Sequence, residues 1–181
     1  MFACEHAQVS PDIMCLSKAI TGGYLPLGAT LTTAAVYDAF LSRDRTRTFF
    51  HGHSFTGNPL SCAVALASLD LFQETDALQK VARLELWLRV GLEPLRKLPL
   101  VGDVRVIGGV GVLELVGDKS SKTAGGYLDD IGPRLTQAFL DRGLMLRPLG
   151  HVLYLMPPYV ITEEETAWAI AQIRDVISTL A

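Results

Sequence analysis

Three groups of residues have types and spacings that suit chemistry, and the first centres on a lysine. The apolar run Ile13-Met14-Cys15-Leu16-Ser17-Lys18 ends on that lysine, and paired glycines follow at positions 22 and 23. The pattern predicts a short buried strand over 13–16 that places Lys18 at a strand end, where loops build sites. A partly desolvated lysine there has an amine suited to bonding a carbonyl carbon. The alternative is an ordinary surface lysine that closes a strand.

The second group is a loop rich in aromatic residues, hydroxyls and glycines, His51-Gly52-His53-Ser54-Phe55-Thr56-Gly57-Asn58-Pro59. Asn58 is suited to cap the helix that follows, with Pro59 as its first residue. A loop that leads into a helix N-terminus can offer backbone N–H groups to an anion, and Ser54 and Thr56 add hydroxyl donors. We expect the bound anion to be a phosphate group.

Two other interpretations of this loop stay open. It could be an ordinary turn between a strand and a helix. It could also hold a metal, because His51 and His53 would face the same side of a strand. No Asp, Glu or Cys lies close by in the sequence to complete a ligand set. We therefore favour the anion site over the metal site.

The third group surrounds an arginine near the end of the chain. Arg147 closes a predicted strand over 144–147 and precedes Pro148. A guanidinium at a strand end can hold a carboxylate through two hydrogen bonds, although a surface arginine is the alternative. Tyr154 and Tyr159 flank Met-Pro-Pro, and either could line a pocket; we interpret Tyr159 as a core residue.

Composition limits the classes of function. The chain has 181 residues, 49% of them hydrophobic, which is enough for a core in one large domain or two lobes. Its net charge of −3 argues against nucleic acid as a partner. Its three cysteines form no CxxC pair, which favours a reducing cytoplasm over a disulfide framework. No apolar run is long enough to span a membrane, so neither membrane insertion nor secretion is expected.

The remaining pattern predicts the elements that must position these residues. In a first lobe we expect a strand over 27–33, a helix over 34–41 and a helix over 60–72. In a second lobe we expect a helix over 75–97, a hairpin of strands 104–107 and 110–115 around Gly108-Gly109, a polar loop over 117–126, a helix over 127–142, and a strand over 152–156. A capping box from Thr162 to Glu165 begins the last helix.

Together these segments resemble a known family, the class III pyridoxal-phosphate aminotransferases, over nearly the whole chain. The resemblance rests on Phe2-Ala3-Cys4-Glu5-His6-Ala7, on 11–23 and on the loop that starts at His51. Arg147-Pro148 followed by Leu153-Tyr154-Leu155-Met156-Pro157-Pro158-Tyr159 is similar to the branch of adenosylmethionine-8-amino-7-oxononanoate aminotransferases of biotin synthesis. The resemblance implies an α/β fold, that of the fold type I PLP-dependent transferases. Residues 1–73 would end the large PLP-binding domain, and 74–181 would form the small C-terminal α+β domain.

The resemblance also implies roles for individual residues. Lys18 would be the catalytic lysine that bonds pyridoxal 5′-phosphate. Ser54 would bind the cofactor phosphate across a homodimer interface from the partner subunit's Lys18, with His53 as a further cofactor residue.

Other residues would serve the substrates. Arg147 would hold the substrate carboxylate, and Tyr154 and Gly52 would line the substrate pocket. The implied reaction takes nitrogen from S-adenosylmethionine and passes it to 8-amino-7-oxononanoate, which gives 7,8-diaminononanoate.

In this family the aspartate that pairs with the pyridine nitrogen, the phosphate loop of the same subunit and the ring-stacking aromatic residue lie upstream of the position matched by Met1. We therefore expect the chain to be the C-terminal portion of a longer enzyme, with little activity alone. Two alternatives remain. The chain could belong to a class III aminotransferase with another amine donor, or it could be a noncatalytic dimerisation module.

Overall fold

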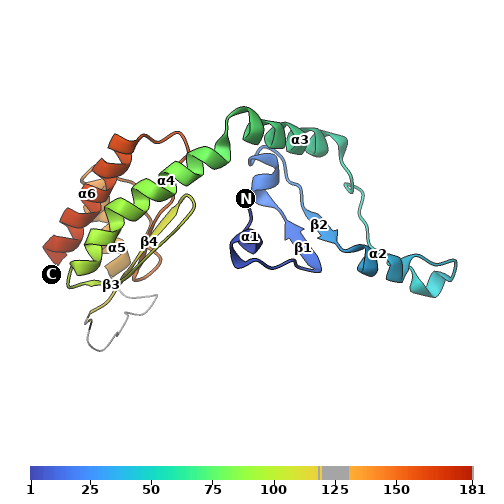
Figure 1. The fold of residues 1–181 in the computed structure, drawn as a ribbon, viewed down its shortest axis with the longest axis horizontal. Helices are drawn as coiled ribbons and strands as arrows, with labels where there is room; N and C mark the ends of the chain where they lie inside the picture. The colour runs from blue at the N-terminus through green and yellow to red at the C-terminus, as the bar shows by residue number, and fades with distance from the viewer. Residues whose placement is uncertain (118, 120–130, 181) are drawn as a thin grey trace. The chain divides into compact units, whose positions relative to one another are not determined.

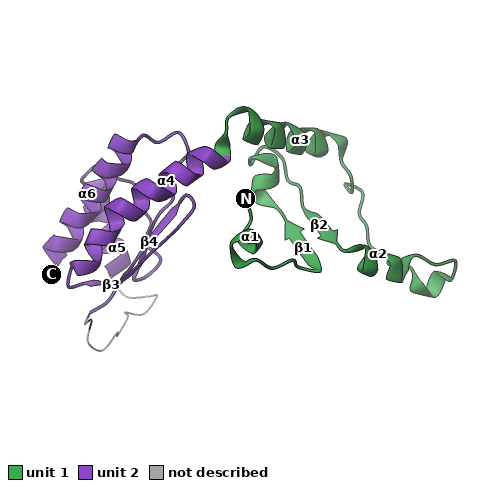
Figure 2. Cartoon of the chain, viewed as in Figure 1, with its two compact units in different colours: residues 1–77 green, residues 78–181 purple. Residues whose placement is uncertain are grey.

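The chain divides into two compact units in the computed structural model, residues 1–77 and 78–181 (Figure 2). The structure describes residues 1–117, 119 and 131–180. The sequence predicts a boundary between residues 73 and 74, and the assignment of the two parts to a large and a small domain stays a prediction.

Unit 1 is built around a two-stranded hairpin and a long helix (Figure 1). Its elements are α1 (Ala3–Ala7), β1 (Ile13–Leu16), η1 (Lys18–Thr21), β2 (Ala29–Thr32), α2 (Ala34–Phe40), η2 (Arg45–Arg47) and α3 (Pro59–Glu74). Strands β1 and β2 pair antiparallel, with Cys15 opposite Thr30. The structure confirms the predicted strands and the predicted start of α3 at Pro59.

The prediction of a buried strand at 13–16 is wrong for this chain. Ile13 on β1 is 57% exposed, and unit 1, which is described throughout, buries no hydrophobic side chain larger than alanine. The apolar pattern indicated a strand correctly, but within unit 1 this strand is only partly covered, with Met14 and Leu16 half-buried and Ile13 and Cys15 exposed. Unit 1 therefore presents its site on an open framework instead of a packed core.

Unit 2 has a three-stranded antiparallel sheet, in the order β3-β4-β5, that packs with three helices. Its elements are α4 (Ala77–Leu92), η3 (Glu93–Lys97), β3 (Val101–Ile107), β4 (Val110–Leu115), α5 (Ile131–Leu140), β5 (Val152–Leu155) and α6 (Glu163–Leu180). The predicted hairpin at Gly108-Gly109 is confirmed. Alternate residues of β4 and β5 are buried, which is typical of a sheet with one covered face.

Glycines let α4 approach both this sheet and α6 closely. A Cβ atom added at Gly111 on β4 would lie 2.4 Å from Leu92 Cδ1, and one at Gly91 would lie 2.5 Å from Ile170 Cδ1 on α6. The hydrophobic core of the described chain, from Leu84 to Ile177, lies in this unit. Unit 2 thus has the buried apolar surface that unit 1 lacks.

Arg96 connects η3 to strand β3 through hydrogen bonds. Arg96 donates to Asp103 Oδ1 at 2.8 Å and to the Val104 carbonyl at 2.7 Å, and Arg105 donates to Asp103 from the other side. The two guanidinium groups lower the pKa of Asp103, with Arg96 contributing most.

The expected strand at 144–147 is wrong. Gly143 has a φ of 75° and ends α5, and the Leu144 N–H donates to the Phe139 carbonyl at 2.9 Å, as in a helix C-terminal cap. Pro148 has no N–H to donate, and pairing resumes as an isolated bridge between Leu149 and Val152. Arg147 consequently lies in an irregular segment.

Two further predictions for unit 2, the helix over 127–142 and the capping box at Thr162, can be compared with the structure. The helix expected over 127–142 is found as α5, and its proposed start lies outside the described residues, as does most of the loop expected over 117–126. The capping box is confirmed, because Glu165 N–H donates to Thr162 Oγ1 at 3.1 Å and Thr162 N–H donates to Glu165 Oε2 at 2.9 Å. Within the described ranges, no helix is long and apolar enough to cross a membrane.

Candidate active site

Lys18 lies directly after β1 with an unusual backbone conformation. Its φ is 54°, in the left-handed region that residues with a side chain seldom adopt. The preceding Ser17 is extended, and its hydroxyl donates to the Leu27 carbonyl at 3.5 Å. Such conformations persist where the surrounding structure enforces them, and they cluster at functional sites. The turn therefore aims Lys18 away from the direction that a continuing strand would give it.

Two buried hydroxyls hold the segment between Lys18 and β2. Thr21 is buried and donates to the Leu25 carbonyl. Ser61, buried in the first turn of α3, donates to the Pro26 carbonyl at 3.3 Å. The start of α3 is itself fixed by Asn58, whose Oδ1 accepts from the N–H groups of Leu60 and Ser61. These contacts bring the predicted loop and the Lys18 turn together.

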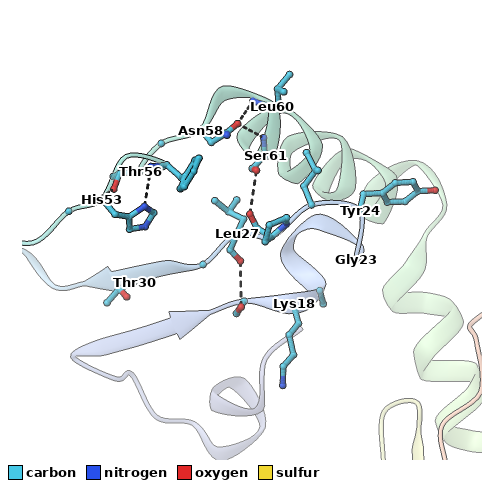
Figure 3. A pocket seen from close by; sticks show the side chains of 18 of the residues that line it. Lys18, Gly23, Tyr24, Leu27, Thr30, His53, Thr56, Asn58, Leu60 and Ser61 are labelled. Carbon is cyan, nitrogen blue, oxygen red and sulfur yellow. Dashed lines mark hydrogen bonds between the residues drawn. The ribbon is translucent and has the colours of Figure 1, made fainter.

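The result is an open hollow of about 1730 Å³, lined by residues between 17 and 30 and between 49 and 61 (Figure 3). Of the residues predicted from the sequence, Lys18, Gly52, His53 and Thr56 line it. Ser54 does not, although both of its neighbours do. Arg147 and Tyr154 are not among the lining residues, and both belong to unit 2.

The loop at 51–59 satisfies several of its own backbone groups. The N–H of His53 donates to Thr56 Oγ1 at 3.1 Å, and that of Phe55 donates to His53 Nδ1 at 3.1 Å. The N–H of Thr56 donates to the His53 carbonyl and that of Asn58 to the Phe55 carbonyl. The predicted set of anion donors is thus smaller than expected.

The donors that remain are few and close in sequence. The N–H groups of Gly52, Ser54 and Gly57 donate to no atom of the described residues, and neither does the Ser54 hydroxyl. Thr56 accepts through its hydroxyl oxygen and keeps its proton to donate.

Lys18 and this loop do not converge on a common point within one copy of the chain. In Figure 3 the Lys18 side chain extends away from the end of the hollow occupied by His53 and Thr56. Lys18 is also exposed, so the desolvation predicted for it is not found in these residues. Within unit 1 the end of β1 is only partly covered, because Leu16 is half-buried while Ser17 and Lys18 are exposed.

The histidines of the loop have other contacts. His51 stacks on Phe49 with ring centroids 5.5 Å apart, and Phe49 in turn contacts Phe40. His53 accepts through Nδ1 from Phe55 N–H, which places its own proton on Nε2 when the ring is neutral. In the part of the chain that the structure describes, no three His, Cys, Asp or Glu side chains come together as a metal site would need.

In unit 2, Arg147 is exposed, and its guanidinium has no ion-pair or hydrogen-bond partner among the described residues. Tyr154 lies on β5 opposite Val112, half-buried and between the core residues Leu153 and Leu155, so it faces the other side of the sheet. Tyr159, interpreted as core from the sequence, is 48% exposed.

Sequence reasoning missed some residues of the hollow. Tyr24, Leu27 and Thr30 line it without having been singled out. For Tyr24 a signal was present, because an aromatic residue directly after paired glycines indicates a turn that presents a side chain. Leu27 and Thr30 gave no such signal.

Comparison with known proteins identifies the family. The family model for class III aminotransferases matches residues 1–177. The adenosylmethionine-8-amino-7-oxononanoate aminotransferase of Synechococcus elongatus is 48% identical over 179 residues, which is 99% of this chain and 41% of that protein. The enzyme of the same name from Geobacter sulfurreducens is 47% identical over 181 residues, 99% of this chain and 40% of that protein. The chain thus spans about two-fifths of the length of these curated relatives.

Solved structures agree in fold. The crystal structure of adenosylmethionine-8-amino-7-oxononanoate aminotransferase from Methanocaldococcus jannaschii superposes with a TM-score of 0.88 at 38% identity, covering 99% of this chain and 42% of that one. An amine transaminase from an uncultivated Pseudomonas species, in its PLP-bound form, gives a TM-score of 0.90 at 31% identity, covering 100% of this chain and 41% of that one. These neighbours confirm the predicted fold class, the fold type I PLP-dependent transferases. The chain belongs to the class III aminotransferase family.

Proposed function

We propose that this chain belongs to an aminotransferase that converts 8-amino-7-oxononanoate to 7,8-diaminononanoate with S-adenosylmethionine as amino donor. The observation that carries the proposal is the identity of 48% and 47% with relatives that bear this enzyme's name, across 99% of the chain. The placement of Lys18, exposed on a hollow and held in a left-handed turn, supports it.

The residues present suit pyridoxal 5′-phosphate, the cofactor of this family, which combines an aldehyde with a phosphate. Lys18 offers an exposed amine to the aldehyde. The Ser54 hydroxyl and the N–H groups of Gly52 and Ser54, which have no acceptor among the described residues, would offer donors to the phosphate, and His53 Nε2 would offer another. When bound, the cofactor supplies an electron sink for charge that develops on the substrate carbon. The Lys18 amine would take the proton from the amino-bearing carbon of the donor and, in the second half of the reaction, would deliver a proton to the acceptor carbon that receives the nitrogen.

The direction of Lys18 supports a homodimer. Because the Lys18 side chain extends away from the loop of its own copy (Figure 3), Ser54 and the loop are free to serve the partner subunit's Lys18. Ser54 also lies outside the hollow that contains its own Lys18.

Arg147 and Tyr154 are proposed to recognise the substrate. The guanidinium of Arg147 is exposed and has no partner in the described part of the chain, so it is available to bind a carboxylate. Tyr154, on the open face of the sheet, would contact the substrate chain, as would Gly52 of the loop.

The proposed donor is tested with the purified full-length enzyme. We expect 7,8-diaminononanoate to form from 8-amino-7-oxononanoate with S-adenosylmethionine, at a kcat/KM well above that with lysine or with a simple primary amine. The amine transaminase among the structural neighbours favours a second candidate, an enzyme that takes nitrogen from such simple amines. Turnover with those amines and none with S-adenosylmethionine would establish the second candidate. The same assay on the 181-residue chain checks the expectation of little activity alone.

Replacing Arg147 by lysine is expected to raise the KM for 8-amino-7-oxononanoate by about 100-fold, with a smaller change in kcat. The reason is that lysine keeps the charge but loses the two parallel hydrogen bonds of the guanidinium fork, and hydrogen bonds to charged groups contribute about 1.5–3 kcal/mol each. Steady-state kinetics at saturating amino donor measure the effect.

The matched control for this prediction is Arg142→Lys, which alters an arginine that contacts Gln172 and Asp175 on α6. This variant should keep its KM within about twofold, because surface pairs contribute little. An unchanged KM in Arg147→Lys would remove Arg147 from the substrate site.

A further inference from the structure

We propose that a small pocket in unit 2 binds a planar carboxylate, that is, a carboxylate anion attached to a flat aromatic or unsaturated body. The pocket has a volume of about 300 Å³ and lies between one face of α4 and residues 159–161, the turn before α6. Its lining residues on α4 are Lys80, Arg83, Leu84 and Trp87. The proposed aminotransferase function assigns no role to any of them.

The walls of this carboxylate pocket are built before any ligand arrives. Leu84 forms the floor and is 1% exposed. The turn is fixed by a hydrogen bond from Ile161 N–H to the Pro158 carbonyl at 3.0 Å, and the capping box of α6 follows at once. A preformed pocket loses less conformational entropy on binding.

The Tyr159 ring owes its position to a glycine. A Cβ atom added at Gly109, in the hairpin between β3 and β4, would lie 3.0 Å from Tyr159 Cε1. The ring therefore lies close to the backbone of the hairpin at Gly109, and it also lines the pocket. Trp87, half-buried on α4, supplies a second aromatic wall.

Among the described residues, the two cations of the pocket, Lys80 and Arg83, have no ion-pair partner. Lys80 and Arg83 contact no carboxylate and donate no hydrogen bond within the described part of the chain. Nearby arginines differ, since Arg89 pairs with Glu85 at 2.7 Å and Arg96 pairs with Glu93 at 2.7 Å. Two cations that share a pocket without a counter-charge favour an anionic ligand.

Together the charges and the walls select the class of ligand. A guanidinium fork matches the two oxygens of a carboxylate, and an ammonium can add a third contact. The faces of Trp87 and Tyr159 suit a flat apolar body. An inorganic anion would use the charges and leave both aromatic walls in water. The volume, near the lower end for ligand pockets, limits the ligand to one ring or an equivalent chain.

The test uses tryptophan fluorescence of the full chain. Of the two tryptophans, Trp168 on α6 is replaced by phenylalanine, so that emission reports Trp87. Benzoate is titrated as the probe, and benzamide serves as its uncharged counterpart. We expect saturable quenching by benzoate, with a Kd about tenfold or more below that of benzamide, because a charge-assisted hydrogen bond is worth at least a factor of ten.

Matched variants test whether Lys80 and Arg83 are responsible for benzoate binding. Arg83→Gln and Lys80→Gln keep most of the side-chain stem and should each weaken benzoate about tenfold. Lys97→Gln removes an exposed cation of the same unit outside the pocket and should leave the Kd unchanged. Circular dichroism verifies that each variant is folded. Equal affinity for benzoate and benzamide, no saturable quenching, or an unchanged Kd in both pocket variants would overturn the proposal.

Discussion

Replacing Lys18 by alanine in the full-length enzyme is expected to abolish covalent attachment of pyridoxal phosphate and to lower the transamination rate by roughly 10³-fold or more. In the proposed mechanism two functions are lost together, because the same amine would hold the cofactor and move the substrate proton. Alanine is also less suited to the left-handed backbone at this position, where φ is 54°. Lys18→Gly, which accepts that backbone, separates the loss of the amine from local strain and should be equally inactive.

Covalent attachment of pyridoxal phosphate to Lys18 can be measured independently of activity. After mixing with pyridoxal phosphate and reduction by borohydride, the modified lysine resists trypsin. The next basic residue after Lys18 is Arg43, so the labelled peptide should end at Arg43 with Lys18 uncleaved. Lys97→Ala, which removes an exposed lysine of unit 2, should keep the label on that peptide. Labelling of Lys18→Ala to the wild-type extent would show that another lysine bonds the cofactor.

Local chemistry explains which elements were predictable. Asn58 and Pro59 begin α3 as expected, and Thr162 with Glu165 begins α6, because each cap is formed by residues within three positions of one another. The strand expected at 144–147 failed for a local reason too. Gly143 turns the chain back to cap α5, and the apolar residues after it bury one side chain, Leu146, without pairing as a strand.

Burial was less predictable than secondary structure. The pattern over 13–16 indicates a strand. Whether that strand is buried depends on other segments that pack against it, and a local sequence pattern carries no information about them. Tyr159 shows the same limit. Its aromatic type suggested the core, whereas its ring packs on Gly109 at the surface and is 48% exposed. That contact joins residues 50 positions apart, which no sequence period reveals.

The candidate site was predictable in its residue types and not in its hydrogen bonds. Lys18, Gly52 and His53 were named from the sequence and line one hollow. The number of free donors in the loop depends on how its backbone turns, and that turn uses His53 and Thr56 for its own closure. The direction of the Lys18 side chain follows from its positive φ. Among the amino acids only glycine commonly indicates a positive φ, so the sequence did not predict this conformation at a lysine.

Replacing Phe139 by alanine is expected to lower the free energy of unfolding of unit 2 by about 3–5 kcal/mol, the usual cost of removing a buried aromatic ring. Phe139 on α5 is 0% exposed and belongs to the core cluster that α4, α6 and the sheet share. Urea unfolding followed by tryptophan emission measures the effect, since Trp87 and Trp168 both lie in unit 2.

The neighbouring residue provides the control for this prediction. Leu140 is on the same helix and is 47% exposed, so Leu140→Ala should cost about 1 kcal/mol or less. The two variants have the same helix propensity change to within a few tenths of a kcal/mol, which leaves burial as the difference between them. Equal losses in the two variants would mean that α5 does not bury Phe139 as described. A large loss for Phe139→Ala together with a small loss for Leu140→Ala would establish that the buried core described for unit 2 stabilises this unit.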